Sequence, residues 1–469
     1  MNIKIDVKKN KFNKGEIILL LLIVIFIFSL TMSPIISWII TTSKAIRAGT
    51  SKEQALQIAE AGINYYQWHL AHFPTDYKDG TNIAGPYVHD YTDLDTQTTI
   101  GQYSLTIIPP LNGSTIVTIT STGYTINNPQ VKRTITAKYG IPSLAVYSFL
   151  SNDIIWIGST ETVNGQIQSN NGIRFDGIGN APISSAKSTY MCSKAQSGPC
   201  PITKNGVWGS ASQAVQSFWQ FPVPAIDFSS LTSNLANMKG SAQSDGIYLP
   251  PSNTNGYSLV FNDNSTVSIY KITSLLNTPV GSDINKVVHN EDIDYNARSL
   301  QYTKALPNNG IIYIEDNAWV EGIVNGRVMV AAAKLPYVST TAPTIYIPNN
   351  ITYKAKDGSS VLGLLAQKDI VVTYNAPTNL EIDAALISQN GSTQFFYYPG
   401  SPLAIKNSIS IYGSIMTFGQ WTWTWVSGST NVSGYAKTID TYDDNLLYSP
   451  PPSFPLSSDG YKQISWISN

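Results

Sequence analysis

An apolar run from Ile17 to Ile40, which contains no charged residue, limits the folds open to this chain more than any other feature. A helix that crosses a bilayer needs about 20 apolar residues, whereas the apolar part of a secretory signal has about 7–15. No small-residue cleavage pattern follows the run, and Trp38 stands near its far end, where interfacial aromatic residues are common. The run therefore predicts one permanent transmembrane helix.

The charges on either side of this run predict its orientation. The leader, residues 1–15, carries five lysines and one aspartate, whereas Lys44 and Arg47 follow the run. The positive-inside rule then places the N-terminus in the cytoplasm and the bulk of the chain outside the cytoplasmic membrane. Pro34 removes one backbone hydrogen bond from the helix interior, so a kink is expected there.

A helical pattern continues beyond the membrane, so we expect one long helical segment over 16–73 that ends before Pro74. In the stretch "ALQIAEAGINYYQWHL", small and aromatic residues recur at helical spacing: Ala55, Ala59, Gly62 and Tyr66. Small side chains let another helix or a sheet approach closely. The alternative is an ordinary amphipathic helix that packs on its own domain.

These features together resemble the N-terminus of type IV pilin-like proteins. A basic leader ending in Gly15, an apolar helix with a proline and the following "QIAEAGINYY" are most similar to the PilX-like minor pilins. The resemblance implies cleavage between Gly15 and Glu16 by a prepilin peptidase and packing of the helix with other pilins. This chain departs from the major pilins at the fifth mature position, which is Leu20 here instead of glutamate.

Two β-rich regions are expected after the helix. Residues 85–140 alternate apolar and polar side chains, which predicts a small antiparallel sheet like the one that follows the helix in minor pilins. From 144 to 450, short aliphatic runs recur between Gly and Asn. Aligning Gly363, Ala385 and Gly413 gives intervals of about 22 and 28 residues, in the range of solenoid repeats.

The fold class predicted is therefore α+β and mainly β, with a right-handed parallel β-helix as the largest part and a β-sandwich as the alternative. We expect 181–308 to be an insertion on one side of the solenoid, and 451–469 to be a C-terminal tail. Stretches such as "VLGLLAQKDIVV" and "YDDNLLYSPPPSFP" also resemble the C-terminal region of bacterial PilX-like proteins, for which the resemblance implies no activity.

The two cysteines of the chain, Cys192 and Cys200, lie in one loop. Their short spacing permits a disulfide in an oxidising compartment, and two free thiols are the alternative. A zinc site would need two more ligands, and no histidine lies nearby in the sequence.

No catalytic or nucleotide-binding motif is present, so we expect no enzyme activity, no cofactor and no metal. Two groups of acids, Glu291–Asp294 and Asp440–Asp444, are the residues to consider for acid–base chemistry or calcium, although acids in such loops commonly form turns. His69 and His72 lie one helical turn apart and by themselves make a weak metal site.

The stretch "QWTWTWV" places three tryptophans, Trp421, Trp423 and Trp425, on one face of a strand. The row is expected to seal the C-terminal end of the solenoid, and if it is exposed it offers a contact surface for glycans.

Composition agrees with an extracytoplasmic β protein, because only 13% of residues are charged. A net charge of −1 with no basic block beyond the N-terminus argues against nucleic acid as a partner. The expected role is a membrane-anchored minor pilin-like structural protein of a type IV pilus or related system, with other pilins and the membrane as partners. One alternative is an anchored β-helix that binds or degrades polysaccharides, with surface glycans as its partners. Another is an anchored surface protein that does not enter a filament.

Overall fold

The computed structural model describes residues 14–93, 95–111, 113–228, 234–277, 279–428, 430–457 and 460–468. The chain forms two compact units. Unit 1 comprises residues 1–108, 118–138 and 463–469, and unit 2 comprises 109–117 and 139–462. The predicted leader, residues 1–15, lies outside the described residues except for its last two positions.

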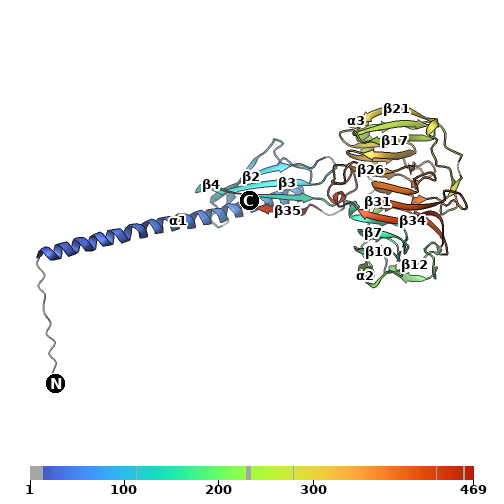
Figure 1. Ribbon diagram of the computed structural model, residues 1–469. Helices are drawn as coiled ribbons and strands as arrows, with labels where there is room; N and C mark the ends of the chain where they lie inside the picture. Colours follow the sequence, from blue (N-terminus) through green and yellow to red (C-terminus); the bar gives the residue numbers. More distant parts are fainter. Residues whose placement is uncertain are drawn as a thin grey trace, which may run out of the picture. The chain divides into compact units, whose positions relative to one another are not determined.

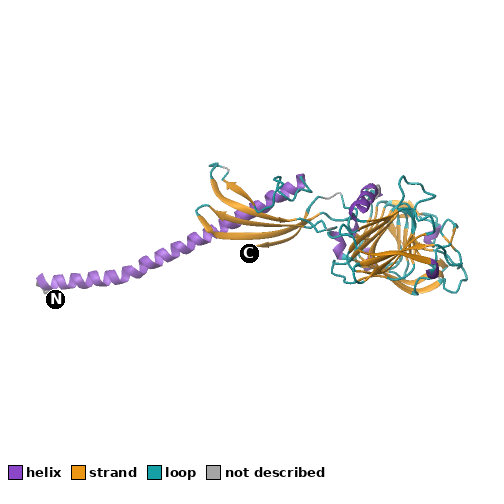
Figure 2. Ribbon diagram, turned by 90° about the horizontal axis from the view of Figure 1, so that it is seen from above, coloured by secondary structure: helices purple, strands orange, loops and turns teal. Residues whose placement is uncertain are grey.

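Unit 1 consists of one long helix and one five-stranded sheet (Figures 1 and 2). The helix α1 spans Lys14–His72 and has Pro34 in its interior. Strands β1, β2 and β3 pair antiparallel, and β4 and β35 continue the sheet in that order. The last strand comes from the predicted tail. The bounds are β1 Tyr87–Thr92, β2 Thr99–Ile108, β3 Val117–Thr125, β4 Asn128–Gly140 and β35 Lys462–Ser468.

Most strands of unit 2 lie in one 23-stranded sheet that is built mainly from parallel pairs. The first stack of strands is parallel throughout and contains, in spatial order, β15 (Trp219–Gln220), β11 (Ile183–Ser185), β8 (Gln166–Ser169), β5 (Tyr147–Ser151), β31 (Ile405–Thr417), β29 (Asn379–Ser388), β27 (Val361–Ala366), β24 (Arg327–Ala332), β22 (Ile311–Ile314) and β16 (Ile247–Leu249). A β-sandwich made of antiparallel sheets does not have this pairing.

A second parallel stack uses the N-terminal halves of β31 and β29 together with neighbouring strands. Its order is β10 (Ile178–Gly179), β7 (Thr162–Asn164), β34 (Thr430–Tyr442), β31, β29, β26 (Ile351–Tyr353), β23 (Ala318–Val324) and β17 (Gly256–Asn262).

A third stack runs in the order β32 (Trp421–Thr422), β30 (Thr393–Phe395), β28 (Ile370–Val372), β25 (Ile345–Ile347) and β23. A separate three-stranded sheet contains β6 (Ile155–Ile157), β9 (Ile173–Phe175) and β14 (Val207–Trp208). The third stack and this small sheet are not joined by strand pairing among the described residues.

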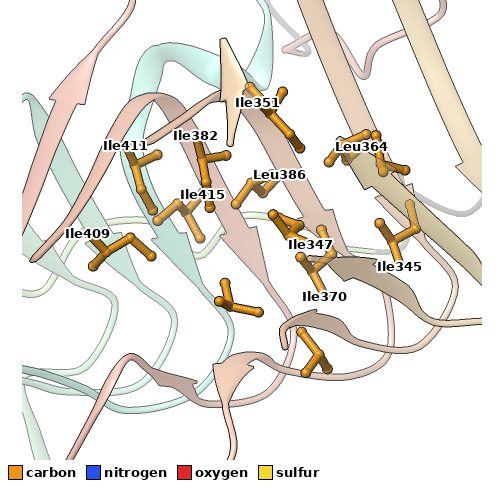
Figure 3. Close-up of a cluster of buried hydrophobic side chains, with 14 of the residues drawn as sticks. Ile345, Ile347, Ile351, Leu364, Ile370, Ile382, Leu386, Ile409, Ile411 and Ile415 are labelled. Carbon is orange, nitrogen blue, oxygen red and sulfur yellow. The ribbon is translucent and has the colours of Figure 1, made fainter. Parts of the chain in front are cut away.

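The stacks enclose an aliphatic core. Because residues in register on parallel strands point to the same side, isoleucines and leucines of successive strands form ladders. Figure 3 shows Ile351, Ile382, Ile411, Ile370 and Leu364 projecting into this common interior from different strands. Their burial is the main apolar contribution to the stability of unit 2.

The order of strands in space differs from their order in the chain. The last strands, β31 and β34, pair with the first ones, β5 and β7. Strand β15 lies at one end of the first stack, whereas β16, the next strand of this stack along the chain, lies at the opposite end. The two strands that are consecutive in this stack along the chain therefore lie at its opposite ends.

The range expected to be an insertion, 181–308, supplies part of the large sheet itself. β11 pairs in parallel with β8, β16 with β22, and β17 with β23. The antiparallel pairs in this range are β12 (Thr189–Met191) with β13 (Thr203–Asn205), β17 with β18 (Thr266–Ile272), β18 with β21 (Arg298–Ala305), and β19 (Gly281–Ser282) with β20 (Val288–His289).

A second apolar layer covers the outer side of the first stack. The helix α3 (Leu235–Asp245) contributes Leu235, Met238 and Ala242, and the C-terminal segment contributes Leu446 and Phe454. Strand β27 is consequently buried on both faces, which explains its uninterrupted apolar sequence. The short helix α2 spans Gln213–Gln216.

Candidate functional site

The N-terminal half of α1 is the first candidate site, because its apolar side chains are exposed. Ile17, Leu20, Phe26 and Trp38 are each more than half exposed in the monomer. By length and composition α1 is the one helix among the described residues that can cross a membrane, with a mean hydropathy of 2.7 over its most apolar window. Such a surface is stable in a bilayer or against other apolar helices.

The C-terminal half of α1 packs on the sheet of unit 1. Ala55, Ala59 and Tyr66 are fully buried. A Cβ added to Gly123 of β3 would lie 2.3 Å from the backbone oxygen of Ala55, so helix and strand are in backbone contact there. A Cβ added to Gly62 would lie 2.3 Å from the Ser121 hydroxyl of β3 and 2.7 Å from the Tyr103 ring of β2. Three of the four residues expected to pack against a helix or a sheet, Ala55, Ala59 and Gly62, therefore contact the chain's own sheet.

Gly15 and Glu16 lie in the first turn of α1, and Pro34 lies inside the helix, which continues to His72. Glu16 is the acidic residue of this first turn. His69 and His72 point to different partners: His69 contacts Asp76 at 3.1 Å, and His72 contacts the backbone oxygen of Trp68 at 2.8 Å. These two histidines therefore belong to separate local contacts.

The second candidate site is a cavity of about 440 Å³ in unit 2, which we call the tryptophan cavity. It is lined on one side by Trp156 and Glu161 and on the other by residues 420–426. Trp421 lies in β32, and Trp425 lies in β33 (Thr424–Ser427). Strand β33 pairs antiparallel with β34, the next strand along the chain.

The tryptophans of residues 421–425 are not an exposed row and do not seal the end of the stack. Trp423 is 1% exposed and Trp421 is 8% exposed, so neither offers a free surface for glycans outside the cavity. The expectation of an end seal is wrong, because β31 and β34 of the same coil pair with β5 and β7 on their outer side. The tryptophans thus lie inside unit 2.

The disulfide loop forms one wall of the tryptophan cavity. Cys192 and Cys200 are joined by a disulfide with a Cα–Cα distance of 5.5 Å. Within the loop, Gln196 donates a hydrogen bond to the backbone oxygen of Ile155 in β6 (2.8 Å) and accepts one from Tyr190 (2.9 Å). The loop is thereby attached to the strand that carries Trp156.

Two buried carboxyl groups lie in this part of unit 2. Glu161 accepts a hydrogen bond from the Gly158 N–H at 2.5 Å and lines the cavity. Asp440 stands in an aliphatic ladder, in register between Ile411 and Val163. Neither carboxyl oxygen of Asp440 has a hydrogen-bond partner among the described residues. Burial raises the pKa of Glu161 to about 8 and that of Asp440 to about 7.

These raised pKa values predict that Glu161 and Asp440 each contribute stability to unit 2 that is present in acid and is lost as the pH rises through the folded pKa. A carboxyl that stays neutral in the folded state binds a proton that the unfolded chain releases, so the unfolding free energy falls as the pH rises. Each group contributes a slope of about 1.4 kcal/mol per pH unit between its unfolded and folded pKa. For Asp440 this window runs from about pH 4 to about pH 7.

Urea unfolding of the wild type and of D440N at several pH values within this window measures that slope. We expect the unfolding free energy of D440N to fall less steeply with pH than that of the wild type, because the contribution of Asp440 to the slope is removed. The exposed Asp245 at the end of α3, changed to Asn, controls for the loss of one charge. Equal slopes in the wild type and D440N would contradict the assignment.

The other acids singled out in the sequence have structural partners. Glu291 is 1% exposed and hydrogen-bonds the Tyr398 hydroxyl, and Asp292 accepts from the Asn375 N–H at 3.0 Å. Asp294 and Asp443 cap short 3-10 turns. Within the described ranges, no group of three or more His, Cys, Asp or Glu is placed to hold a metal ion.

Sequence reasoning did not find Trp156 or Glu161. Each stands alone in an unremarkable strand or turn, Trp156 in "IIWIG" and Glu161 in "STETV". Only the pairing of the first strands with the last ones brings them near Trp421 and Trp425.

No family model matches this chain, and no curated protein matches it. Among solved structures, the chain is similar to the competence-associated pilin ComZ from Thermus thermophilus, with 12% sequence identity, a TM-score of 0.29, and coverage of 89% of this chain and 98% of that one. Because this TM-score is too low to establish a shared fold, we infer nothing about this chain from the similarity.

Proposed function

We propose that this chain is a membrane-anchored, pilin-like structural subunit of the PilX type, in a type IV pilus or a related system. The observation that supports this most is the division of α1. Its N-terminal half exposes an uncharged apolar surface, whereas its C-terminal half is buried against the sheet of unit 1. A helix of this kind anchors a subunit in the membrane and offers the same surface to the apolar helices of neighbouring subunits.

We further propose that unit 2 is a right-handed parallel β-helix which the anchor presents outside the cytoplasmic membrane. Parallel pairing in three stacks around a common aliphatic core supports a β-helix. The lysines of the leader support an N-terminus in the cytoplasm, and the disulfide between Cys192 and Cys200 supports an oxidising compartment for unit 2. The proposed role is structural or adhesive and involves no catalysis.

Deletion of the protein tests this role. We expect fewer pili on the cell surface, or pili that adhere less well, when deletion cells are imaged and assayed for adhesion. Re-expression of the wild-type chain should restore both. Unchanged piliation, adhesion and secretion in the deletion cells would contradict the proposal.

Whether the bond between Gly15 and Glu16 is cleaved distinguishes a filament subunit from a simple membrane anchor. We expect mass spectrometry of the purified protein to find Glu16 as the first residue, with a methylated amino group, as the resemblance to pilins implies. The variant G15L should retain Met1, because the peptidase requires the glycine before the cut. A wild-type chain that also keeps Met1 would remove the filament role and leave the membrane anchor.

A further inference from the structure

We propose that the tryptophan cavity of unit 2 binds a neutral sugar residue of an oligosaccharide. This inference is independent of the filament role, since an anchor or a filament subunit would present the same cavity. The proposed site lies between β32 and β6, where the third stack ends and the separate sheet begins.

The cavity exists because the third stack is broken beside β32. On one side, β32 pairs with β30, and on the other, β6 pairs with β9 in a separate sheet. After Trp423 the chain continues as β33, which pairs antiparallel with β34, the next strand along the chain, and has no pairing with β6. The space left between β32 and β6 is therefore not filled by a continuous ladder of core side chains.

Aromatic rings on both sides of the cavity are held in place by other groups. Trp425 donates a hydrogen bond to the backbone oxygen of Phe395 at 2.8 Å, and its ring lies 5.6 Å from that of Tyr397. Opposite, Trp156 donates to Asp176 at 3.0 Å, and the Arg174 guanidinium lies 4.8 Å from its ring centre. Fixed aromatic rings suit the C–H faces of a pyranose, because little side-chain freedom is lost on binding.

The polar groups of the cavity call for a ligand that carries hydroxyl groups. The indole N–H groups of Trp421 and Trp423 have no acceptor among the residues described, but they are buried away from the open space of the cavity. Thr160, Thr422 and Gln420 add further polar side chains to the lining. Sugar hydroxyl oxygens can accept hydrogen bonds from the Gln420 amide and the threonine hydroxyls, and sugar hydroxyl hydrogens can donate to the oxygens of the same side chains.

The same groups argue against charged ligands. One acid, Glu161, and one lysine, Lys194, line the cavity, so it presents no cluster of cations to an anionic sugar acid. A quaternary ammonium ion fits an aromatic cage but offers neither a donor nor an acceptor to Thr160, Gln420 and Thr422. The volume of about 440 Å³ lies within the range of about 300–1,000 Å³ that is usual for small-molecule sites.

Binding is tested on the full chain, purified in an oligo-oxyethylene detergent, which carries neither sugar nor choline. Tryptophan fluorescence and calorimetry follow titration with cellotriose, maltotriose, mannotriose and chitotriose. Trigalacturonic acid and choline serve as the anionic and cationic comparisons. We expect at least one neutral trisaccharide to bind with a Kd below about 1 mM, and the anion and the cation to bind at least about tenfold more weakly.

Three variants connect binding to the cavity. W425A removes one aromatic wall and should weaken binding about tenfold or more, whereas W425F keeps a ring and should retain most of the affinity. Trp68, an exposed tryptophan of unit 1, provides the matched control W68A, which should leave the affinity unchanged.

Three outcomes would overturn the proposal. The first is no binding of any neutral trisaccharide up to about 10 mM. The second is binding that W425A leaves unchanged although circular dichroism shows that the variant is folded. The third is preferential binding of choline or of trigalacturonic acid, which would assign the cavity to a ligand of another class.

Discussion

Two lysines in the apolar half of α1, introduced as I23K and I27K, are expected to release the chain from membranes. Both isoleucines are exposed in the monomer and lie in the middle of the uncharged run. A lysine at the centre of a transmembrane helix costs about 2.5–3.5 kcal/mol, so the pair costs about 5–7 kcal/mol. Cell fractionation followed by alkaline carbonate extraction measures the result.

The matched control for this experiment is A45K, which adds a lysine beside Lys44 beyond the apolar run. It should stay in the carbonate-resistant pellet like the wild type. If the double variant also remains there, α1 does not hold the chain in the membrane, and the anchor in the proposed function is wrong.

The substitution G413A is expected to destabilise unit 2 by at least about 3 kcal/mol, at the upper end of overpacking effects. Gly413 has a φ of +153°, and a Cβ there would lie 2.0 Å from the backbone oxygen of Ala384. Because this oxygen belongs to the adjacent strand β29, the clash can be relieved only by separating two strands of the sheet. Thermal unfolding of the full chain, followed by near-ultraviolet circular dichroism, measures the loss.

Gly240 in α3 supplies the control for G413A. A Cβ there meets no atom within 4 Å, so G240A should be neutral or should stabilise the helix by about 0.5–1 kcal/mol. A G413A protein that melts within error of the wild type would mean that β29 and β31 are not packed as closely as described.

The repeat read from the sequence locates neighbouring strands to within one residue. Gly363 and Ala385, which were aligned by pattern, are in register in β27 and β29. The next aligned residue, Gly413, pairs with Ala384, and Ala385 pairs with Ser414. The pattern follows the repeating aliphatic positions, but it is one residue out between β29 and β31, because Gly413 was aligned with Ala385 and pairs with Ala384.

The tryptophans show the limit of pattern reading most clearly. Alternation in "WTWTW" predicts one strand with three rings on one face. In the structure the strand is interrupted at Trp423, and β33 after the interruption pairs antiparallel with β34, the next strand along the chain. A local pattern cannot predict this interruption, since the partner strand and the first coil of unit 2 together decide where the rings lie.

The sequence by itself determined the features that depend on neighbouring residues: an uncharged helix long enough for a bilayer, a helical segment after it, alternating strands and a repeat of aliphatic runs. Tertiary structure alone decided that Ala55 and Ala59 face the chain's own sheet, that β35 joins it, and that the last strands of unit 2 pair with the first. These results depend on contacts between segments that are distant in the sequence. The hydrophobic effect favours burial of apolar surface but is not directional, so it does not determine which segments pack together. The tryptophan cavity, with Trp156 and Glu161 opposite Trp425, exists only because of that pairing.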